Sequence, residues 1–404
     1  MQSLDGPTRL DLEYIQDPHT VTELLRAEGP VRQAVLPRGL PVWLVTSYAD
    51  GKALLADPRL GKDSRVANEL FAERAAVDQS PVLFPLSLAT HMLNSDPPDH
   101  TRLRKLVNRA FTSRTVARMR PRIEQITKEL LDAMAGRETV DLLEAFAFPL
   151  PITVICELLG VPDDERDDFR RWSNIILSAL PTDELADASS AMTAYLSTLV
   201  EDKRATPDED LLSALVHASD DGDRLSPKEL ISMAFLLLVA GHETTVNLIG
   251  NGVLALLRNQ DQLAVLRADP GLLPNAIEEF LRYDGPVNLA TLRFTTEPVR
   301  VGEVEIPAEE FVMISLLAAN RDGERFPDPT RLDVTRQPGG HLAFGHGIHY
   351  CVGAPLARLE GEVAIGGLLE RFPAVRLAAE PAELRWRDST LMRGLETLPI
   401  RPRG

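Results

Sequence analysis

Cys351 is the residue of this chain whose setting most clearly indicates chemistry. It lies in the run Phe344-Gly345-His346-Gly347-Ile348-His349-Tyr350-Cys351-Val352-Gly353, and an apolar, helix-like pattern follows from Ala354. Glycines at this spacing let the backbone pass close to a large flat ligand. A cysteine that enters a helix N-terminus is held as thiolate by amide N–H groups and the helix dipole. The run predicts a metal-binding thiolate, and the alternative is a buried structural cysteine after a Gly-rich turn.

A second unusual segment interrupts the longest predicted helix, at about 227–257. Ser226 and Glu229 form a capping box at its start. The apolar pattern is then broken by Ala240-Gly241-His242-Glu243-Thr244-Thr245. Glycine and threonine are unfavourable inside a helix, and threonine can bond back to a carbonyl and bend it. Local rules broken at one place indicate a functional site. The alternatives are ordinary back-bonding for Thr244 and a plain surface acid for Glu243.

Two charged pairs have helical spacing. Glu279 and Arg282 are i,i+3, which places both on one face. His100 and Arg104 are i,i+4 after the run Asp96-Pro97-Pro98, so both would point one way, toward a pair of carboxylates. Each pair by itself is also typical of a solvated helix surface.

Together these segments resemble the cytochromes P-450. Residues 344–353 are similar to the haem-binding loop of that family, and 240–245 to the acid–alcohol segment of its central helix. Glu279 to Arg282 resembles the family's ExxR helix, and 320–326 the segment whose arginine completes a buried Glu–Arg–Arg network. The resemblance implies haem b with Cys351 as axial ligand. A thiolate on haem iron favours O–O cleavage.

The resemblance also implies a role for each matching residue. Ala240 and Gly241 would open the central helix beside the iron, Thr244 would help to deliver protons to dioxygen, and Glu243 would relay them from solvent. Propionate binding is implied for His100, Arg104, Arg293 and His349, and further cofactor contacts for Phe344, Gly345 and Gly353. The structural network would consist of Glu279, Arg282 and Arg325, next to Gly323 where the family often has proline.

Leu236–Gly252 and His341–Glu360 look like actinobacterial enzymes that oxidise macrolides, other polyketides and steroid-like compounds. We expect substrate contacts from about 62–95, from 172–190, from the distal face of the central helix and from the turns at 287–291 and 391–392. The candidates are Leu93, Leu237, Val239, Ala240, Asn288, Leu289 and Leu391. For each of them the alternative is core packing.

The chain has 404 residues, of which 44% are hydrophobic, so it can bury a large core. No Pro/Gly/Ser-rich linker divides it, which predicts one domain over 1–404. Helical periodicity dominates, with short strand-like runs at 41–46, 299–306 and 311–315. The predicted fold class is mainly α with a minor β region. The resemblance implies a triangular-prism helical domain with small β-sheets.

The net charge of −17 argues against nucleic acid or an anionic membrane as partner. The N-terminus has no basic region, and the most apolar stretch, 233–240, is too short to span a bilayer. The two cysteines make no disulfide framework, and zinc lacks a fourth ligand. We expect a cytoplasmic protein.

No GxGxxG or Walker-type loop is present, so electrons must come from outside. The resemblance implies a ferredoxin and a ferredoxin reductase, with a docking face around Cys351 to which Arg104, Arg109 and Arg358 contribute. The predicted function is a haem–thiolate monooxygenase that hydroxylates a bulky apolar molecule with dioxygen and two supplied electrons. The alternatives are epoxidation, desaturation or oxidative coupling by the same chemistry, a non-catalytic haem sensor, and a scaffold that has lost haem.

Overall fold

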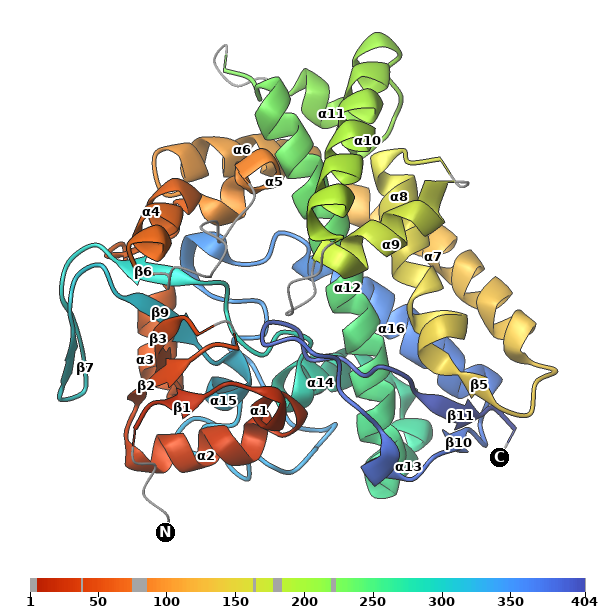
Figure 1. Ribbon diagram of the computed structural model, residues 1–404. Helices are drawn as coiled ribbons and strands as arrows, with labels where there is room; N and C mark the ends of the chain where they lie inside the picture. The colour runs from red at the N-terminus through yellow and green to blue at the C-terminus, as the bar shows by residue number, and fades with distance from the viewer. Residues whose placement is uncertain are drawn as a thin grey trace.

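The computed structural model describes residues 6–37, 39–74, 86–162, 165–176, 184–218 and 223–403. Its helices are α1 (Leu12–Gln16), α2 (Pro18–Glu28), α3 (Tyr48–Leu55), α4 (Ser64–Arg74), α5 (Leu86–Ala89), α6 (Asp99–Ala110), α7 (Ser113–Met134), α8 (Pro149–Leu159), α9 (Arg166–Ile176), α10 (Leu185–Ala205), α11 (Leu211–His217), α12 (Pro227–Arg258), α13 (Gln260–Ala268), α14 (Leu273–Asp284), α15 (Leu316–Asn320) and α16 (Ala354–Arg371). In Figure 1 most of the longer helices lie above and to the right of a small sheet, whereas α1 and α2 lie below that sheet.

The strands are β1 (Thr8–Arg9), β2 (Val31–Val35), β3 (Pro41–Val45), β4 (Leu60–Gly61), β5 (Val140–Asp141), β6 (Arg293–Thr295), β7 (Val299–Val301), β8 (Val304–Ile306), β9 (Phe311–Ile314), β10 (Arg376–Leu377) and β11 (Pro399–Arg401). The largest sheet has the order β1-β2-β3-β9-β6-β4, and two smaller sheets are β10-β11-β5 and β7-β8. The predicted fold class, mainly α with a minor β region, is confirmed.

Helix α12 is the centre of the helical part and packs against α8, α10, α14 and α16. The capping box of Ser226 and Glu229 begins it, because each side chain accepts the other residue's backbone N–H. By length and composition α12 could cross a membrane, but 78% of its most apolar window is buried inside the protein. We therefore interpret α12 as a core helix, around which the other helices are arranged (Figure 1).

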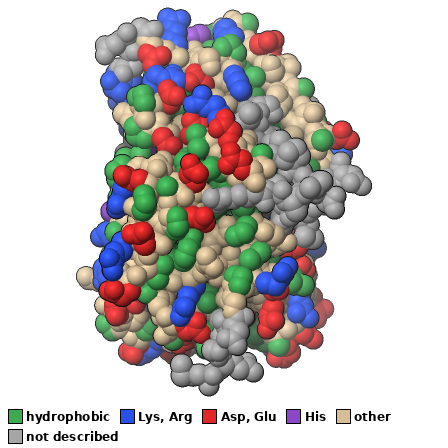
Figure 2. All heavy atoms as spheres, turned by 60° about the vertical axis from the view of Figure 1, so that its left-hand side comes forward, with side chains coloured by type: hydrophobic (Ala, Val, Ile, Leu, Met, Phe, Trp, Pro, Cys, Tyr) green, Lys and Arg blue, Asp and Glu red, His purple; other side chains and the backbone are tan. Residues whose placement is uncertain are grey.

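The face that carries the sheet mixes acidic and basic side chains with apolar ones (Figure 2). Beneath it lies a separate apolar cluster formed by the N-terminal helices and the sheet, including Leu10, Tyr14, Phe294 and Leu289. The helical part has its own larger cluster, to which α12 contributes Leu237 and Val239. The sheet part has a further apolar cluster, which includes Val45, Val312 and Ile314. The molecule thus has one helical core and two apolar clusters at the sheet.

Candidate haem site

The Cys351 loop is a closed turn between η5 (Gly347–His349) and α16. The backbone N–H of Cys351 donates to the carbonyl of Phe344 over 2.9 Å. Gly347 has a φ of +74°, and a Cβ there would lie 2.9 Å from the Cα of Ala56. Only glycine fits this position, because the backbone is left-handed and packs directly on the end of α3.

The surroundings of the Cys351 sulfur act on the pKa of its thiol in opposite directions. Burial raises the pKa of the thiol, while the amides of Gly353 and Ala354 and the charges of Arg104 and Arg358 lower it. A coordinated metal ion deprotonates a thiol outright. The other cysteine, Cys156, has no exposed surface and belongs to the helical core. Cys351 is therefore the cysteine of this chain that fits an iron ligand.

Five basic side chains from four segments converge beside this loop: Lys62 after β4, His100 and Arg104 on α6, Arg293 on β6, and His349. The imidazole centroids of His100 and His349 are 4.3 Å apart. Burial lowers the pKa values of all five, that of Arg293 to about 10. Repulsion by other members of the cluster lowers the pKa values of Lys62, His100 and His349 further. Among the described residues, neither ring nitrogen of His100 has a hydrogen-bond partner, and the Nε of Arg293 has none either.

Buried polar atoms without partners are costly. The nearby carboxylate of Asp96 accepts backbone N–H groups of Lys62 and Asp63 at 2.9–3.0 Å, so it is already engaged. A group that carries two carboxylates, as haem does, would satisfy this cluster. The residues present therefore fit haem, and they support the predicted propionate contacts. The sequence analysis did not identify Lys62, because it belongs to none of the motifs. Its burial, with 3% exposure, becomes evident only in the folded structure.

The acid–alcohol segment forms part of α12. The Thr244 hydroxyl donates to the carbonyl of Ala240 over 2.9 Å, as the back-bonding alternative expects. Ala240 is exposed and Thr244 half-buried, so the shared face retains open surface within a largely buried helix. A Cβ on Gly241 would lie 2.9 Å from Ile155 on α8. Gly241 thus allows α8 to pack closely, and this contact is a structural reason for glycine that the sequence did not indicate.

Glu243 is not a surface acid, since it is 2% exposed. Its Oε1 forms an ion pair with the guanidinium of Arg387, from the segment after α16. Its Oε2 lies 3.7 Å from Nε2 of His242 and accepts no hydrogen bond. The plain-surface alternative for Glu243 is wrong, and Arg387 is a partner that the sequence did not reveal.

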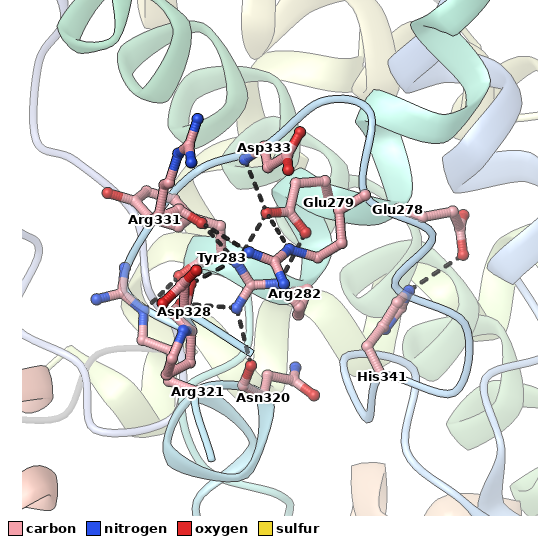
Figure 3. A network of polar contacts seen from close by, with 12 residues as sticks. Glu278, Glu279, Arg282, Tyr283, Asn320, Arg321, Asp328, Arg331, Asp333 and His341 are labelled. Atoms are coloured by element: carbon pink, nitrogen blue, oxygen red, sulfur yellow. Dashed lines mark hydrogen bonds and ion pairs between the residues drawn. The ribbon is translucent and has the colours of Figure 1, made fainter. Parts of the chain in front are cut away.

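The buried network is built as predicted around Glu279 and Arg282, but its third arginine is Arg336. Arg282 donates to both oxygens of Glu279 over 2.7 and 2.8 Å and to the carbonyl of Asn320 (Figure 3). Arg336 donates to Glu279 Oε1 over 3.2 Å. The prediction of Arg325 is wrong, because that side chain is exposed and stacks on Tyr48 and Phe326.

A second network holds the Cys351 loop to α14. Glu278 accepts from His341, which precedes the loop, over 3.1 Å, and from Arg358 on α16 (Figure 3). Burial would raise the pKa of Glu278, but the hydrogen bonds and charges of His341 and Arg358 lower it to about 2. The Arg358 guanidinium also lies 4.6 Å from the ring centroid of Phe344. Neighbouring residues of α14 therefore fix both sides of the loop.

Two of the predicted substrate contacts are corrected. Leu289 has no exposed surface and belongs to the sheet core. Asn288 is 2% exposed and accepts from the hydroxyl of Tyr14 over 3.2 Å. Both side chains are therefore engaged inside the protein, Asn288 by the Tyr14 hydroxyl and Leu289 by apolar packing. Leu237 and Val239 are 8% and 6% exposed.

Leu93 and Leu391 retain partial exposure, and Ala240 is exposed. These side chains, with Leu237 and Val239, stay predictions. Residues 75–85 and 177–183, parts of the expected substrate segments, lie outside the described residues.

Comparison with known proteins agrees with this site. The family profile "Cytochrome P450" matches residues 167–386. The chain is 58% identical to Cytochrome P450 107B1 of Saccharopolyspora erythraea, over 97% of this chain and 96% of the relative. It is 52% identical to the Vitamin D(3) 25-hydroxylase of Pseudonocardia autotrophica, over 96% and 94%. The tirandamycin C-bound monooxygenase TamI superposes with a TM-score of 0.91 at 55% identity, covering 98% and 100%.

Fold, loop and relatives define a haem–thiolate oxidoreductase. The chain belongs to the cytochrome P450 family and is a bacterial-type monooxygenase whose cofactor is haem with a cysteine thiolate. The predictions of family, enzyme class and cofactor are confirmed.

Proposed function

We propose that this enzyme hydroxylates a bulky apolar secondary metabolite of the macrolide, polyketide or steroid-like class, in the cytoplasm. The observation that carries the proposal is the closed Cys351 loop beside an unsatisfied cluster of basic side chains. Two relatives support the substrate class, since one is named for vitamin D(3) and one was solved with tirandamycin C. These molecules differ in shape, so the class is defined by bulk and apolar surface.

When bound, haem supplies dioxygen activation and one-electron chemistry. Cys351 would hold its iron, and His100, Arg104, Arg293, His349 and Lys62 would hold its carboxylates. The exposed face of α12 at Ala240 would border the substrate, and the apolar helical core behind it excludes water. Thr244 has a hydroxyl on the exposed face of this helix that can accept and pass a proton. Glu243, whose partner Arg387 is partly exposed, would relay protons from solvent to this hydroxyl.

Electrons would come from a ferredoxin with its reductase, docked around Cys351. Ile348 and Tyr350, which both precede the cysteine, are 52% and 39% exposed, and such exposed fractions are large for apolar and aromatic side chains. Interface centres are enriched in such residues and bordered by charge. Arg104 and Arg358 lie close enough to influence the Cys351 thiol. This small apolar surface with basic neighbours suits an acidic redox protein, despite the net charge of −17.

The first experiment is the carbon monoxide difference spectrum of the dithionite-reduced protein. We expect a Soret band shifted far to the red, which establishes thiolate ligation. Cys351→His should retain some haem, show the band typical of histidine ligation, and lose monooxygenation. A fully active Cys351→His variant would contradict the ligand assignment.

Substrate class is tested by titrating vitamin D(3) and tirandamycin C, with a fatty acid as the slim apolar control. A low- to high-spin shift with the bulky compounds and not with the fatty acid supports the class. The mass of the product then separates hydroxylation from desaturation or coupling. NADPH consumption with a surrogate ferredoxin and reductase separates an enzyme from a haem sensor.

A further inference from the structure

The central helix carries a polar stripe in the middle of the apolar core. Glu243, Asn247 and Asn251 are spaced i, i+4 and i+8, so they lie on one face of α12. All three are at least 96% buried. Buried polar side chains require partners, and a stripe of them on a core helix indicates that another polar element is docked there.

That element is the hairpin 386–395, which follows α16 and has the antiparallel bridge Trp386 to Leu395. Its backbone meets the stripe at two points. Asn251 Nδ2 donates to the carbonyl of Arg393 over 2.9 Å. A Cβ on Gly394 would lie 2.0 Å from Asn247 Oδ1, so the hairpin approaches the helix as closely as backbone allows. The third residue of the stripe, Glu243, is contacted by a side chain of the hairpin, because it forms an ion pair with Arg387.

The hairpin is also tied to the N-terminal helix α1. The Gln16 side chain donates to the carbonyl of Trp386 over 2.8 Å and accepts its N–H over 3.1 Å. Arg393 donates to the carbonyl of Ile15 over 3.0 Å and stacks 3.2 Å from the ring centroid of Trp386. The backbone N–H of Arg387 donates to the carbonyl of Gly394 over 2.9 Å. The base of the Arg387 side chain is thus held at a fixed place above α12.

We propose that Arg387 is the positioning residue for Glu243. Its guanidinium would hold the buried carboxylate turned toward the hairpin side of α12. Because the Arg387 side chain is 32% exposed while Glu243 is 2% exposed, the pair joins the core helix to solvent. The inference rests on the proposed role of Glu243 as proton source. In addition, the hairpin 386–395, and not α12 alone, would determine the orientation of the Glu243 carboxylate.

The ion pair is tested first by a double-mutant cycle in thermal unfolding, which does not depend on turnover. Breaking a buried pair leaves an uncompensated charge, so Arg387→Gln should lower the Tm by about 5 °C. In a Glu243→Gln background the same change should lower the Tm by less than about 1 °C. Equal losses in both backgrounds would overturn the proposal. The control is Arg385→Gln, an exposed arginine of the same segment.

The positioning role is then tested by measuring the peroxide formed per NADPH consumed. The assay contains a surrogate ferredoxin and reductase and the compound, vitamin D(3) or tirandamycin C, that gives a spin shift. Arg387→Gln should raise peroxide and lower product about tenfold, with an unchanged carbon monoxide spectrum. Arg387→Lys should restore most of the coupling, which a packing role alone would not allow. Unchanged coupling in Arg387→Gln overturns the inference. If Glu243→Gln itself leaves coupling unchanged, the proposed role of Glu243 fails, while the stability cycle still decides whether the pair exists.

Discussion

At the scale of single residues, this site is made by side chains that the protein alone does not satisfy. His100 has no partner for either nitrogen, and the Arg293 Nε has none. Thr244 is engaged only with its own helix, which leaves its oxygen able to accept a second hydrogen bond. Such costs are offset where a ligand supplies the missing partner, so the atoms of His100 and Arg293 are consistent with the proposed cofactor contacts.

Thr244→Ala should retain haem and substrate binding but waste electrons. Without the hydroxyl, the apolar face of α12 has no group that passes protons, so product per NADPH should fall about tenfold or more while peroxide rises. The measurement is peroxide and product against NADPH consumed. Thr193→Ala is the control, since its hydroxyl makes the same bond four residues back, to Ser189 over 2.7 Å, on α10. Unchanged coupling in Thr244→Ala would refute the proton-delivery role.

At the scale of elements, α14 acts as the support of the haem loop. Glu279 and Arg282 face the segment 320–336, whereas Glu278 faces His341 and α16 (Figure 3). One short helix therefore anchors the chain on both sides of Cys351. The loop can keep left-handed glycines only because these anchors determine where its two ends lie.

Arg336 and Arg325 form a matched pair for testing the buried network. Arg336→Ala removes one of the two arginines that bind the fully buried carboxylate of Glu279. This loss should lower the free energy of unfolding by about 3 kcal/mol. Arg325→Ala removes exposed ring stacking and should cost about 0.5–1 kcal/mol. Urea unfolding followed by the haem band measures both. Equal losses would restore Arg325 as a member of the network.

Glu278 gives the fold a pH dependence whose sign is determined by its pKa. That pKa is lowered from 4.5 unfolded to about 2 in the fold. The stabilisation is therefore fully present above pH 4.5 and is lost as pH falls toward 2. Because Glu278 is partly exposed, we expect about 2 kcal/mol.

Glu278→Gln should thus lower the Tm at pH 7, and its difference from wild type should shrink between pH 4.5 and 3. Thermal unfolding of both proteins across this range is the measurement. The exposed Glu324→Gln serves as control. A Tm difference that stays constant with pH would exclude the charge of Glu278 as the cause.

At the scale of the whole molecule, the proposed haem site draws on both the helical and the sheet parts. The basic cluster takes Lys62 and Arg293 from the sheet edge, His100 and Arg104 from α6, and His349 from the Cys351 loop. These segments are far apart in the chain, and like charges push them apart. A bound dicarboxylate would reverse that repulsion, so cofactor binding and folding are coupled.

Removing haem should therefore reverse the effect of one substitution. Arg293→Met deletes a buried charge, so in the haem-free protein it should raise the free energy of unfolding by about 1 kcal/mol, and in the loaded protein lower it by about 1–3 kcal/mol. Thermal unfolding of extracted and reconstituted protein measures both signs. Destabilisation in both forms would mean that Arg293 serves packing alone.

The sequence by itself determined the cysteine loop, the capped central helix and the Glu279–Arg282 pair, because each depends on residues within ten positions of one another. Local geometry is enough there: helical spacing decides which side chains share a face. What only the tertiary structure decided are the partners across the chain. Arg336 replaces Arg325, Arg387 reaches Glu243, Lys62 joins the basic cluster, and Leu289 turns into the sheet core. No periodicity encodes these contacts, since they depend on how separate elements pack around a shared core.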